Sequence, residues 1–217
     1  MFSVNILIWA LPVLLAITVH EAAHGYVARA FGDPTAEQAG RITLNPLRHI
    51  DPVGTIAVPL SLYLLSSMMG GSGILFGWAK PVPVNFNRLR HPKADMLWVA
   101  AAGPLSNLAM ALGWACMHSL LGARAPDDYA YGASLMAMAG ISINGVLMLL
   151  NLLPVPPLDG GRIAVSLLPD RLAWKYARIE PFGFLILLAL LLTGLLGVVL
   201  GPLLDGFTAL LMMLFGN

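Results

Sequence analysis

Five residues decide how this sequence is interpreted: His20-Glu21-Ala22-Ala23-His24. On a helix, side chains four positions apart lie on the same face, so the two histidines can bind one metal ion. Two imidazoles at this spacing are typical ligands of Zn²⁺, and a glutamate beside the first can act as a base toward a metal-activated water. The pattern is short, so the surrounding sequence has to support this interpretation.

The sequence around the motif is apolar. The run from Val4 to Phe31 contains no charged residue before the motif, and then His20, Glu21 and His24 occur together. Ionisable side chains within a membrane span are costly and are interpreted by default as functional and paired. The alternative to a functional site is a structural one, in which a helix ends here and its polar residues form hydrogen bonds near the lipid headgroups. We therefore predict a metal site at the end of a first membrane span.

The composition indicates an integral membrane protein. The chain has 217 residues, of which 58% are hydrophobic and 11% charged, and its mean hydropathy is +0.80. Soluble domains carry about 25% charged residues. The net charge of +1 and the lack of a basic block argue against a nucleic-acid partner. A single cysteine, Cys116, excludes an intramolecular disulfide.

The apolar runs predict an all-α polytopic membrane protein, a helical bundle that forms one domain over residues 1–217. The expected spans are residues 4–31, 94–121, 131–153 and 182–200. An amphipathic segment, 163–179, is expected to lie at the membrane interface, and whether a short helix at 203–215 crosses the membrane is left open. Gly103 and Asn107 share one face of the second span, where we expect them to pack against another helix.

The distribution of basic residues predicts the orientation of the chain. Lysines and arginines gather in three connections, at residues 41–48, 80–93 and 162–178, and the positive-inside rule places these in the cytoplasm. The His pair and Asp159 then share the cytoplasmic end only if residues 53–84 make no net crossing. We therefore expect a re-entrant segment that returns in an extended, β-like form, because Pro81 and Pro83 exclude a helix there.

A catalytic zinc ion needs three protein ligands and an open position for water. The candidates for the third ligand are Asp33, Glu37, His49, Asp51, His91 and Asp159. The first five lie in polar connections, where we expect them to face water. Asp159 ends an apolar span beside two glycines, which allow close approach of the backbone. We therefore predict that His20, His24 and Asp159 bind one zinc ion per chain.

Three stretches together resemble the site-2 protease family of intramembrane zinc metalloproteases. They are His20-Glu21-Ala22-Ala23-His24, Ala102-Gly103-Pro104-Leu105-Ser106-Asn107, and Asn151-Leu152-Leu153-Pro154 with Leu158-Asp159-Gly160. The resemblance covers nearly the whole chain and extends to residues 77–85. It is closest to the compact prokaryotic branch, and the chain has no room for the PDZ or C-terminal regulatory domain of other members.

The resemblance implies cleavage of a peptide bond in or beside the transmembrane segment of another membrane protein. The expected substrate is a single-span protein, in some cases already trimmed by another protease. The expected location is the inner or plasma membrane, with the active site toward the cytoplasm. Glu21 would be the catalytic base and Asn151 the oxyanion donor. The substrate would bind along Trp78, Lys80, Pro81, Val82, Pro83 and Val84.

Two other functions stay open at this point. One is a non-catalytic zinc-binding membrane protein, such as a receptor or chaperone; Glu21 argues against it, because a structural zinc site has no need of that carboxylate. The other is a metal transporter with the His pair and Asp159 along its path. Transporters commonly consist of repeated halves, and the sequence shows no internal repeat.

Overall fold

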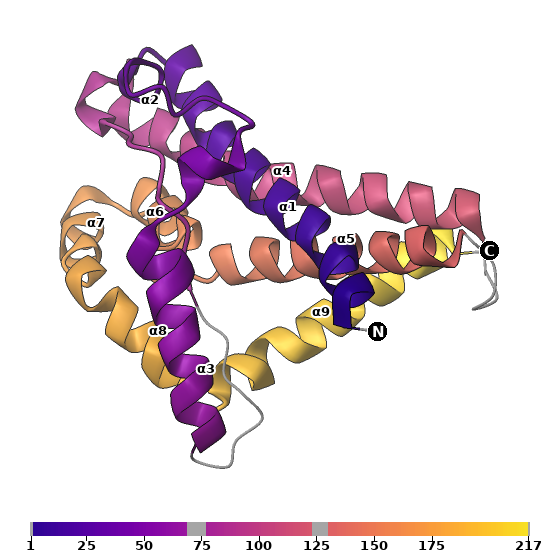
Figure 1. The fold of residues 1–217 in the computed structure, drawn as a ribbon. Coiled ribbons are helices and arrows are strands. Elements are labelled where there is room, and N and C mark those ends of the chain that lie inside the picture. The colour runs from indigo at the N-terminus through magenta and orange to yellow at the C-terminus, as the bar shows by residue number, and fades with distance from the viewer. Residues whose placement is uncertain (1, 69–76, 123–129, 217) are drawn as a thin grey trace.

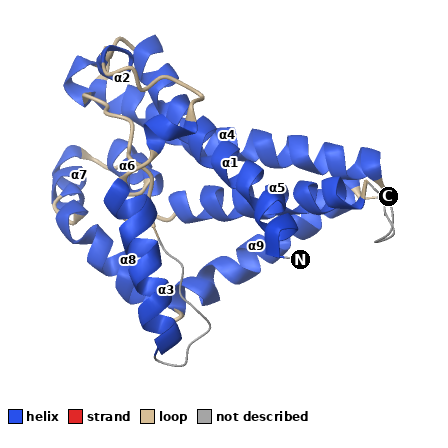
Figure 2. Cartoon of the chain, viewed as in Figure 1, coloured by secondary structure: helices blue, strands red, loops and turns tan. Residues whose placement is uncertain are grey.

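The structure is a computed structural model that describes residues 2–68, 77–122 and 130–216 (Figures 1 and 2). These ranges form helices and connecting segments and contain no β-strand. The helices long and apolar enough to cross a membrane are α1 (Phe2–Ala30, counted from Ile8), α4 (Pro92–Leu121), α5 (Tyr131–Asn151) and α9 (Leu195–Phe215). The predicted all-α polytopic membrane fold is confirmed.

The shorter helices connect these four. They are α2 (Thr35–Gln38), the 3-10 helix η1 (Pro46–His49), the π-helix η2 (Pro52–Ala57), α3 (Val58–Met68), the 3-10 helix η3 (Phe86–Arg88), α6 (Asp159–Leu167), α7 (Asp170–Ala177), the 3-10 helix η4 (Glu180–Phe182) and α8 (Gly183–Leu192). The amphipathic helix expected over 163–179 is thus two helices. The break follows Leu167, because a helix ends at or before the residue that precedes a proline, here Pro169.

Helices α4 and α5 lie side by side along most of their length, and α1 packs across both (Figure 1). Small buried side chains, among them Ala111, Ala115 and Ala137, let the backbones approach closely. A Cβ at Gly140 would lie 2.3 Å from Cδ2 of Trp114, so α5 needs a glycine where it meets this ring. These contacts hold α1, α4 and α5 in one bundle.

The C-terminal region differs from the prediction of a span at 182–200. Helix α8 ends at Leu192, and a separate helix of span length, α9, begins at Leu195. Gly194 between them has φ +74°, a left-handed conformation that ends helices and that glycine adopts without strain. The bounds of the predicted span are wrong. The residues on both sides of this break are apolar, so the hydropathy of the sequence does not reveal where one helix ends and the next begins. The helix expected at 203–215 is the second part of α9.

The segment from 52 to 84 leaves the bundle and returns. Helix α3 projects from the other helices (Figure 1), and residues 69–76 of the expected re-entrant segment lie outside the described residues. Residues 77–85 are extended. The N–H of Trp78 donates to the carbonyl of Gly54 at 3.0 Å, and the Thr55 hydroxyl donates to the Trp78 carbonyl at 2.9 Å. The beginning and end of this segment therefore lie side by side, and its re-entry into a membrane stays a prediction.

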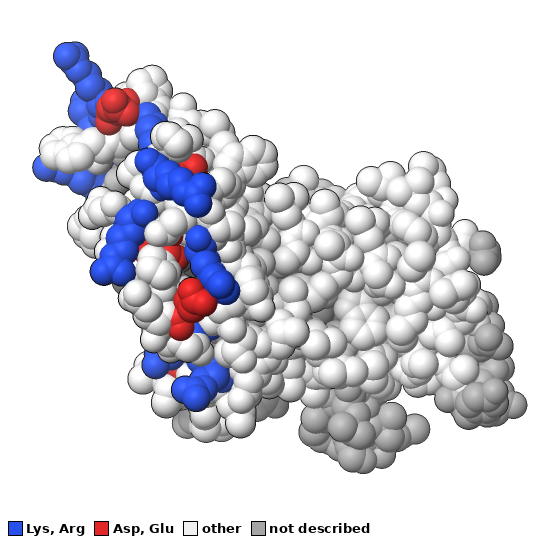
Figure 3. Space-filling view, turned by 90° about the horizontal axis from the view of Figure 1, so that it is seen from above, with Lys and Arg blue, Asp and Glu red and all other residues white. Residues whose placement is uncertain are grey.

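The charged side chains lie at one end of the molecule. Figure 3 shows lysines and arginines gathered where α2, α6 and α7 lie, whereas the other described residues on that face show no charged side chain. Charged groups avoid the hydrocarbon of a bilayer, so an uncharged body beside a charged end is the surface expected of a membrane protein.

Candidate metal centre

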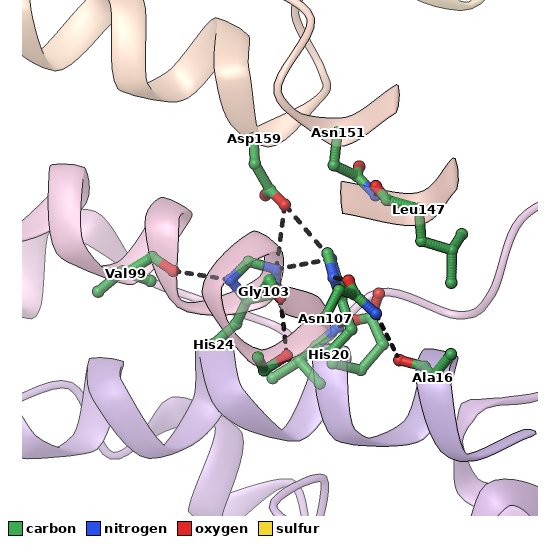
Figure 4. Close-up of polar contacts among 12 residues, drawn as sticks. Ala16, His20, His24, Val99, Gly103, Asn107, Leu147, Asn151 and Asp159 are labelled. Carbon is green, nitrogen blue, oxygen red and sulfur yellow. Dashed lines mark hydrogen bonds and ion pairs between the residues drawn. The ribbon is translucent and has the colours of Figure 1, made fainter. Parts of the chain in front are cut away.

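Three side chains that the sequence singled out lie together at one point. Helix α1 carries His20 and His24 one turn apart, and Asp159 begins α6 (Figure 4). The Nε2 atoms of the two histidines are 3.1 Å apart. The Oδ2 atom of Asp159 lies 3.3 Å from Nε2 of His20 and 3.4 Å from Nε2 of His24. No ordinary packing preference brings two imidazoles and a carboxylate so close.

The hydrogen bonds of the rings show which atoms are available. Nδ1 of His20 donates to Oδ1 of Asn107 at 2.6 Å, and Nδ1 of His24 donates to the carbonyl of Val99 at 2.7 Å. Because Nδ1 carries the proton, Nε2 of each neutral ring presents a lone pair. Oδ2 of Asp159 is buried and has no hydrogen-bond partner in the described part of the chain. Three electron-pair donors therefore converge without a proton between them.

Protonation of both histidines would satisfy all three atoms, and so would a bound cation. Two unit charges 4 Å apart repel by about 4 kcal/mol at an effective dielectric constant of 20, which disfavours the first. Zn²⁺ binds histidine nitrogen at about 2.0–2.1 Å in tetrahedral geometry, which places ligand atoms about 3.3 Å apart. The separations of 3.1–3.4 Å match this edge length. The donor set fits zinc and leaves the fourth position open.

The charge of Asp159 suits this arrangement. Burial opposes ionisation of its carboxyl group, whereas positive charge at this point, on the imidazoles or on a bound metal ion, lowers the pKa of Asp159. The carboxylate is therefore ionised at neutral pH and can act as an anionic ligand.

Gly103 of α4 lies against the two histidines. A Cβ at this position would be 2.5 Å from Cε1 of His20 and 2.5 Å from Nε2 of His24. The sequence predicted Gly103 as a helix-packing residue. In the structure the surface that it packs against is the His pair itself, so its lack of a side chain leaves room for the candidate metal site.

Asn107, one turn further along α4, orients the first histidine. Its Oδ1 accepts from His20, and its Nδ2 donates to Oδ1 of Asn144 at 2.9 Å and to the carbonyl of Ala16 at 3.3 Å. Asn107 and Asn144 are fully buried. Partners of this kind fix the tautomer and orientation of metal-binding histidines. The sequence indicated an interhelical hydrogen bond at Asn107 but not that it reaches His20.

Glu21 lies beside this centre and contacts the extended segment. Its Oε2 accepts a hydrogen bond of 2.8 Å from the backbone N–H of Val82. Val82 is buried, and its Cγ1 would lie 3.3 Å from a Cβ at Gly25 of α1. The segment that was predicted to bind substrate therefore runs along the helix that carries the motif.

The extended segment has no strand partner among the described residues and is held by single bonds from several elements. The N–H of Lys80 donates to the carbonyl of His49 at 2.9 Å, and Arg41 donates to the Lys80 carbonyl at 2.7 Å. Further along, the N–H of Asn85 donates to Oδ2 of Asp33 at 2.6 Å. The connection that follows α1 thus positions the backbone next to Glu21.

Two of these anchoring residues were expected to face water, and that expectation is wrong. Asp33 is 0% exposed and His49 is 2% exposed. Asp33 also accepts from the backbone and hydroxyl of Thr35, a local turn that the sequence Asp33-Pro34-Thr35 itself could have indicated. Its second partner, the backbone N–H of Asn85, is distant in the sequence, so no local sequence pattern indicates this contact.

Asn151, the predicted oxyanion donor, is not joined to the three converging side chains. Its Nδ2 donates to the carbonyl of Leu147 at 2.9 Å, one turn earlier on the same helix (Figure 4). One of its two amide hydrogens is used within α5, and its catalytic role stays a prediction.

Comparison with known proteins assigns the chain to a family. The model of peptidase family M50 matches residues 127–194. The curated "Putative zinc metalloprotease YwhC" of Bacillus subtilis is 39% identical over 199 residues, which cover 90% of this chain and 84% of that protein. The "Putative zinc metalloprotease Rip2" of Mycolicibacterium smegmatis is 33% identical over 83% of this chain and 64% of its own length. The search of solved structures found no match. The chain therefore belongs to peptidase family M50, the site-2 protease family of zinc metalloproteases.

Proposed function

We propose that this chain is an intramembrane zinc endopeptidase that hydrolyses a peptide bond in or near the transmembrane segment of another membrane protein. The observation that supports this most directly is the convergence of three buried donor atoms, from His20, His24 and Asp159, beside the carboxylate of Glu21. A structural metal site has four protein ligands, whereas a catalytic site has three and keeps one position open.

His20, His24 and Asp159 would hold one zinc ion per chain. When bound, zinc would polarise the scissile carbonyl and lower the pKa of its water to about 7. Glu21 accepts the proton of the attacking water and returns it to the leaving amine. The bond from the Val82 N–H to Oε2 orients this carboxylate, so we assign the proton transfer to its other oxygen, Oε1.

The substrate would lie along Trp78–Val84. A peptide bond in a helix is hidden in its own hydrogen bonds, so it must unwind before attack, and an extended partner stabilises the unwound form. The backbone N–H groups of Trp78, Lys80 and Val82 already donate hydrogen bonds within this protein, so they are not available to a substrate. Pro81 and Pro83 have no N–H. The carbonyl groups of Trp78 and Lys80 already accept from Thr55 and Arg41. The segment would therefore hold a substrate mainly through its other carbonyl groups, which accept from substrate N–H groups.

We further propose regulated intramembrane proteolysis of single-span proteins, including those first trimmed by another protease. The enzyme would lie in the inner or plasma membrane with its site toward the cytoplasm. The gathering of basic residues at the end of the molecule that carries α6 supports this orientation (Figure 3). Asn151 would stabilise the oxyanion through its second amide hydrogen.

The test compares the wild type with Glu21→Gln in proteoliposomes that contain a single-span model substrate. Gln at 21 can still accept from Val82, so we expect one zinc per chain in both proteins. Loss of the general base should reduce kcat by about 10²–10⁴-fold. Glu37→Gln is the matched control, because Glu37 is an exposed carboxylate paired with Arg29.

The other two functions predict different results. A non-catalytic zinc-binding protein would not cleave the substrate even as wild type. A transporter would move zinc into the vesicles and would do so in the Glu21→Gln variant as well. Cleavage that survives Glu21→Gln would show that Glu21 is not the base.

A further inference from the structure

A pocket of about 550 Å³ lies between the connection 39–50 and the extended segment at 80–83. Its lining includes Arg41, Arg48 and Lys80, together with Leu47, Pro81 and Pro83. Among the described residues, its lining has three cationic side chains and no carboxylate. The charge of the pocket therefore selects an anionic occupant.

Arg41 gives this pocket a fixed cation. Its side chain is buried, with 8% exposure, and its guanidinium donates to the carbonyl of Lys80 at 2.7 Å. Its Nε is also buried and has no hydrogen-bond partner in the described part of the chain. A guanidinium that is desolvated and only partly satisfied attracts an anion more strongly than one in water.

The pocket and the candidate metal centre share one stretch of backbone. Pro81 and Pro83 line the pocket, and Val82 between them donates its N–H to Glu21. An extended chain rises about 3.3 Å per residue, so Lys80 is within about 7 Å of Val82 along the segment. Consider a substrate polypeptide that lies along this segment with its scissile bond at the metal centre. Its side chains about two to four residues from that bond would then reach the pocket.

We propose that this pocket binds acidic side chains of the substrate polypeptide, about two to four residues from the cleaved bond. The proposal rests on the proposed function as a membrane endopeptidase. The cytoplasmic flanks of membrane spans carry an excess of lysine and arginine. Three cations beside the active site repel such flanks and accept acidic ones, so the pocket selects substrates partly by repulsion.

A binding experiment tests the pocket without requiring cleavage. The full chain with Glu21→Gln is placed in nanodiscs of neutral phosphatidylcholine. Fluorescence anisotropy then compares a fluorescein-labelled peptide with three aspartates against the same peptide with three asparagines. We expect about tenfold tighter binding of the aspartate peptide, falling to about twofold or less at 0.5 M salt, where exposed charges are screened. Equal binding of the two peptides would overturn the proposal.

Arg48→Glu is the informative variant, because Arg48 is an exposed residue of the pocket wall. It should abolish the preference for aspartate. Arg171→Glu makes the same charge change on exposed α7, outside the pocket lining, and should preserve the preference. Loss of preference in both variants would mean that only overall charge matters, which would overturn the proposal.

A cleavage experiment separates this proposal from the proposed function. Single-span substrates with Asp or Asn near the cut should differ about fivefold in kcat/KM, and Arg48→Glu should bring this ratio to one or below. If neither substrate is cut while the aspartate peptide still binds in preference, the endopeptidase function fails and the acidic-peptide site stands. If the peptides bind equally and Arg48→Glu instead weakens binding to phosphatidylglycerol, the pocket is a lipid headgroup site and the proposal is overturned.

Discussion

At the scale of single residues, the candidate site depends on a carboxylate and on a missing side chain. Asp159 contributes the third donor atom, and Gly103 leaves the space that the two imidazoles occupy. Asn107 then fixes the direction of one ring. The contributions of Asp159 and Gly103 each predict a separate change in zinc binding.

Asp159→Ala removes one of the three proposed ligands. We expect one zinc per chain in the wild type and loss of zinc in the variant, by more than about 100-fold in affinity, since even outer contacts of such sites contribute 10–100-fold. Metal analysis of the detergent-solubilised chain measures this. Asp170→Ala is the control, because Asp170 is a fully exposed carboxylate paired with Lys93. Full zinc in Asp159→Ala would mean that another residue is the third ligand.

Gly103→Ala inserts a methyl group where atoms of His20 and His24 lie 2.5 Å from the ideal Cβ position. Because one ring or helix α4 must shift, we expect weaker zinc binding and lower activity, with the helix content unchanged. Gly113→Ala on the same helix meets nothing within 4 Å and should have no such effect. Zinc titration and circular dichroism of both variants test this pair. Equal zinc affinity in the two variants would contradict the structure of the site.

At the scale of elements, the extended segment 77–85 is held without a sheet. Side-chain and backbone groups of the preceding connection bind it, and Glu21 of α1 accepts from its centre. An element of this kind depends on each anchor, because no ladder of backbone bonds compensates for a lost contact.

Asp33→Ala removes the buried anchor of this segment. Hydrogen bonds to charged groups contribute about 1.5–3 kcal/mol each, so we expect a free energy of unfolding lower by about 3 kcal/mol or more. Activity should fall further, because Val82 lies beside the catalytic base. Thermal unfolding with a cleavage assay measures both. Glu37→Ala breaks an exposed ion pair with Arg29 and should change stability by no more than about 1 kcal/mol. Equal losses in the two variants would argue against a special role of Asp33.

At the scale of the whole molecule, the lysines and arginines seen in Figure 3 lie at one end, and the long helices carry few charged side chains. If residues 53–84 make no net crossing, both ends of that segment and the start of α6 lie on the cytoplasmic side. The bonds that join Trp78 to Gly54 and Thr55 support this, because they bring the two ends together.

Cysteine labelling tests this topology. In a Cys116→Ser background, Arg88→Cys and Lys175→Cys should react with an impermeant maleimide only from the cytoplasmic side. Leu120→Cys, at the exposed end of α4, should react only from the outside. Labelling of residue 88 from the outside would mean that residues 53–84 cross the membrane once.

The sequence could predict those features that depend on neighbours along the chain. Long apolar runs predicted the membrane helices, and the spacing of His20 and His24 placed both on one face of α1. It could not predict that α9 begins at Leu195, because the break at Gly194 depends on a backbone angle that hydropathy does not express. The burial of Asp33 and His49 was also missed, since both occur in polar connections.

The sequence by itself determined an all-α membrane protein with two metal-binding histidines on one helix face, because composition and the spacing of the motif are local properties. The metalloprotease class followed from the resemblance of three stretches of sequence to the site-2 protease family. The sequence also singled out Asp159, but only the tertiary structure decided how far this carboxylate lies from the His pair and what Gly103 and Asn107 contact. Asp159, Gly103 and Asn107 come from other helices than the His pair, and their distances follow from how α1, α4, α5 and α6 pack. The same packing lays Val82 beside Glu21 and a cationic pocket beside Val82. Such contacts join residues far apart in the chain, and no local pattern specifies them.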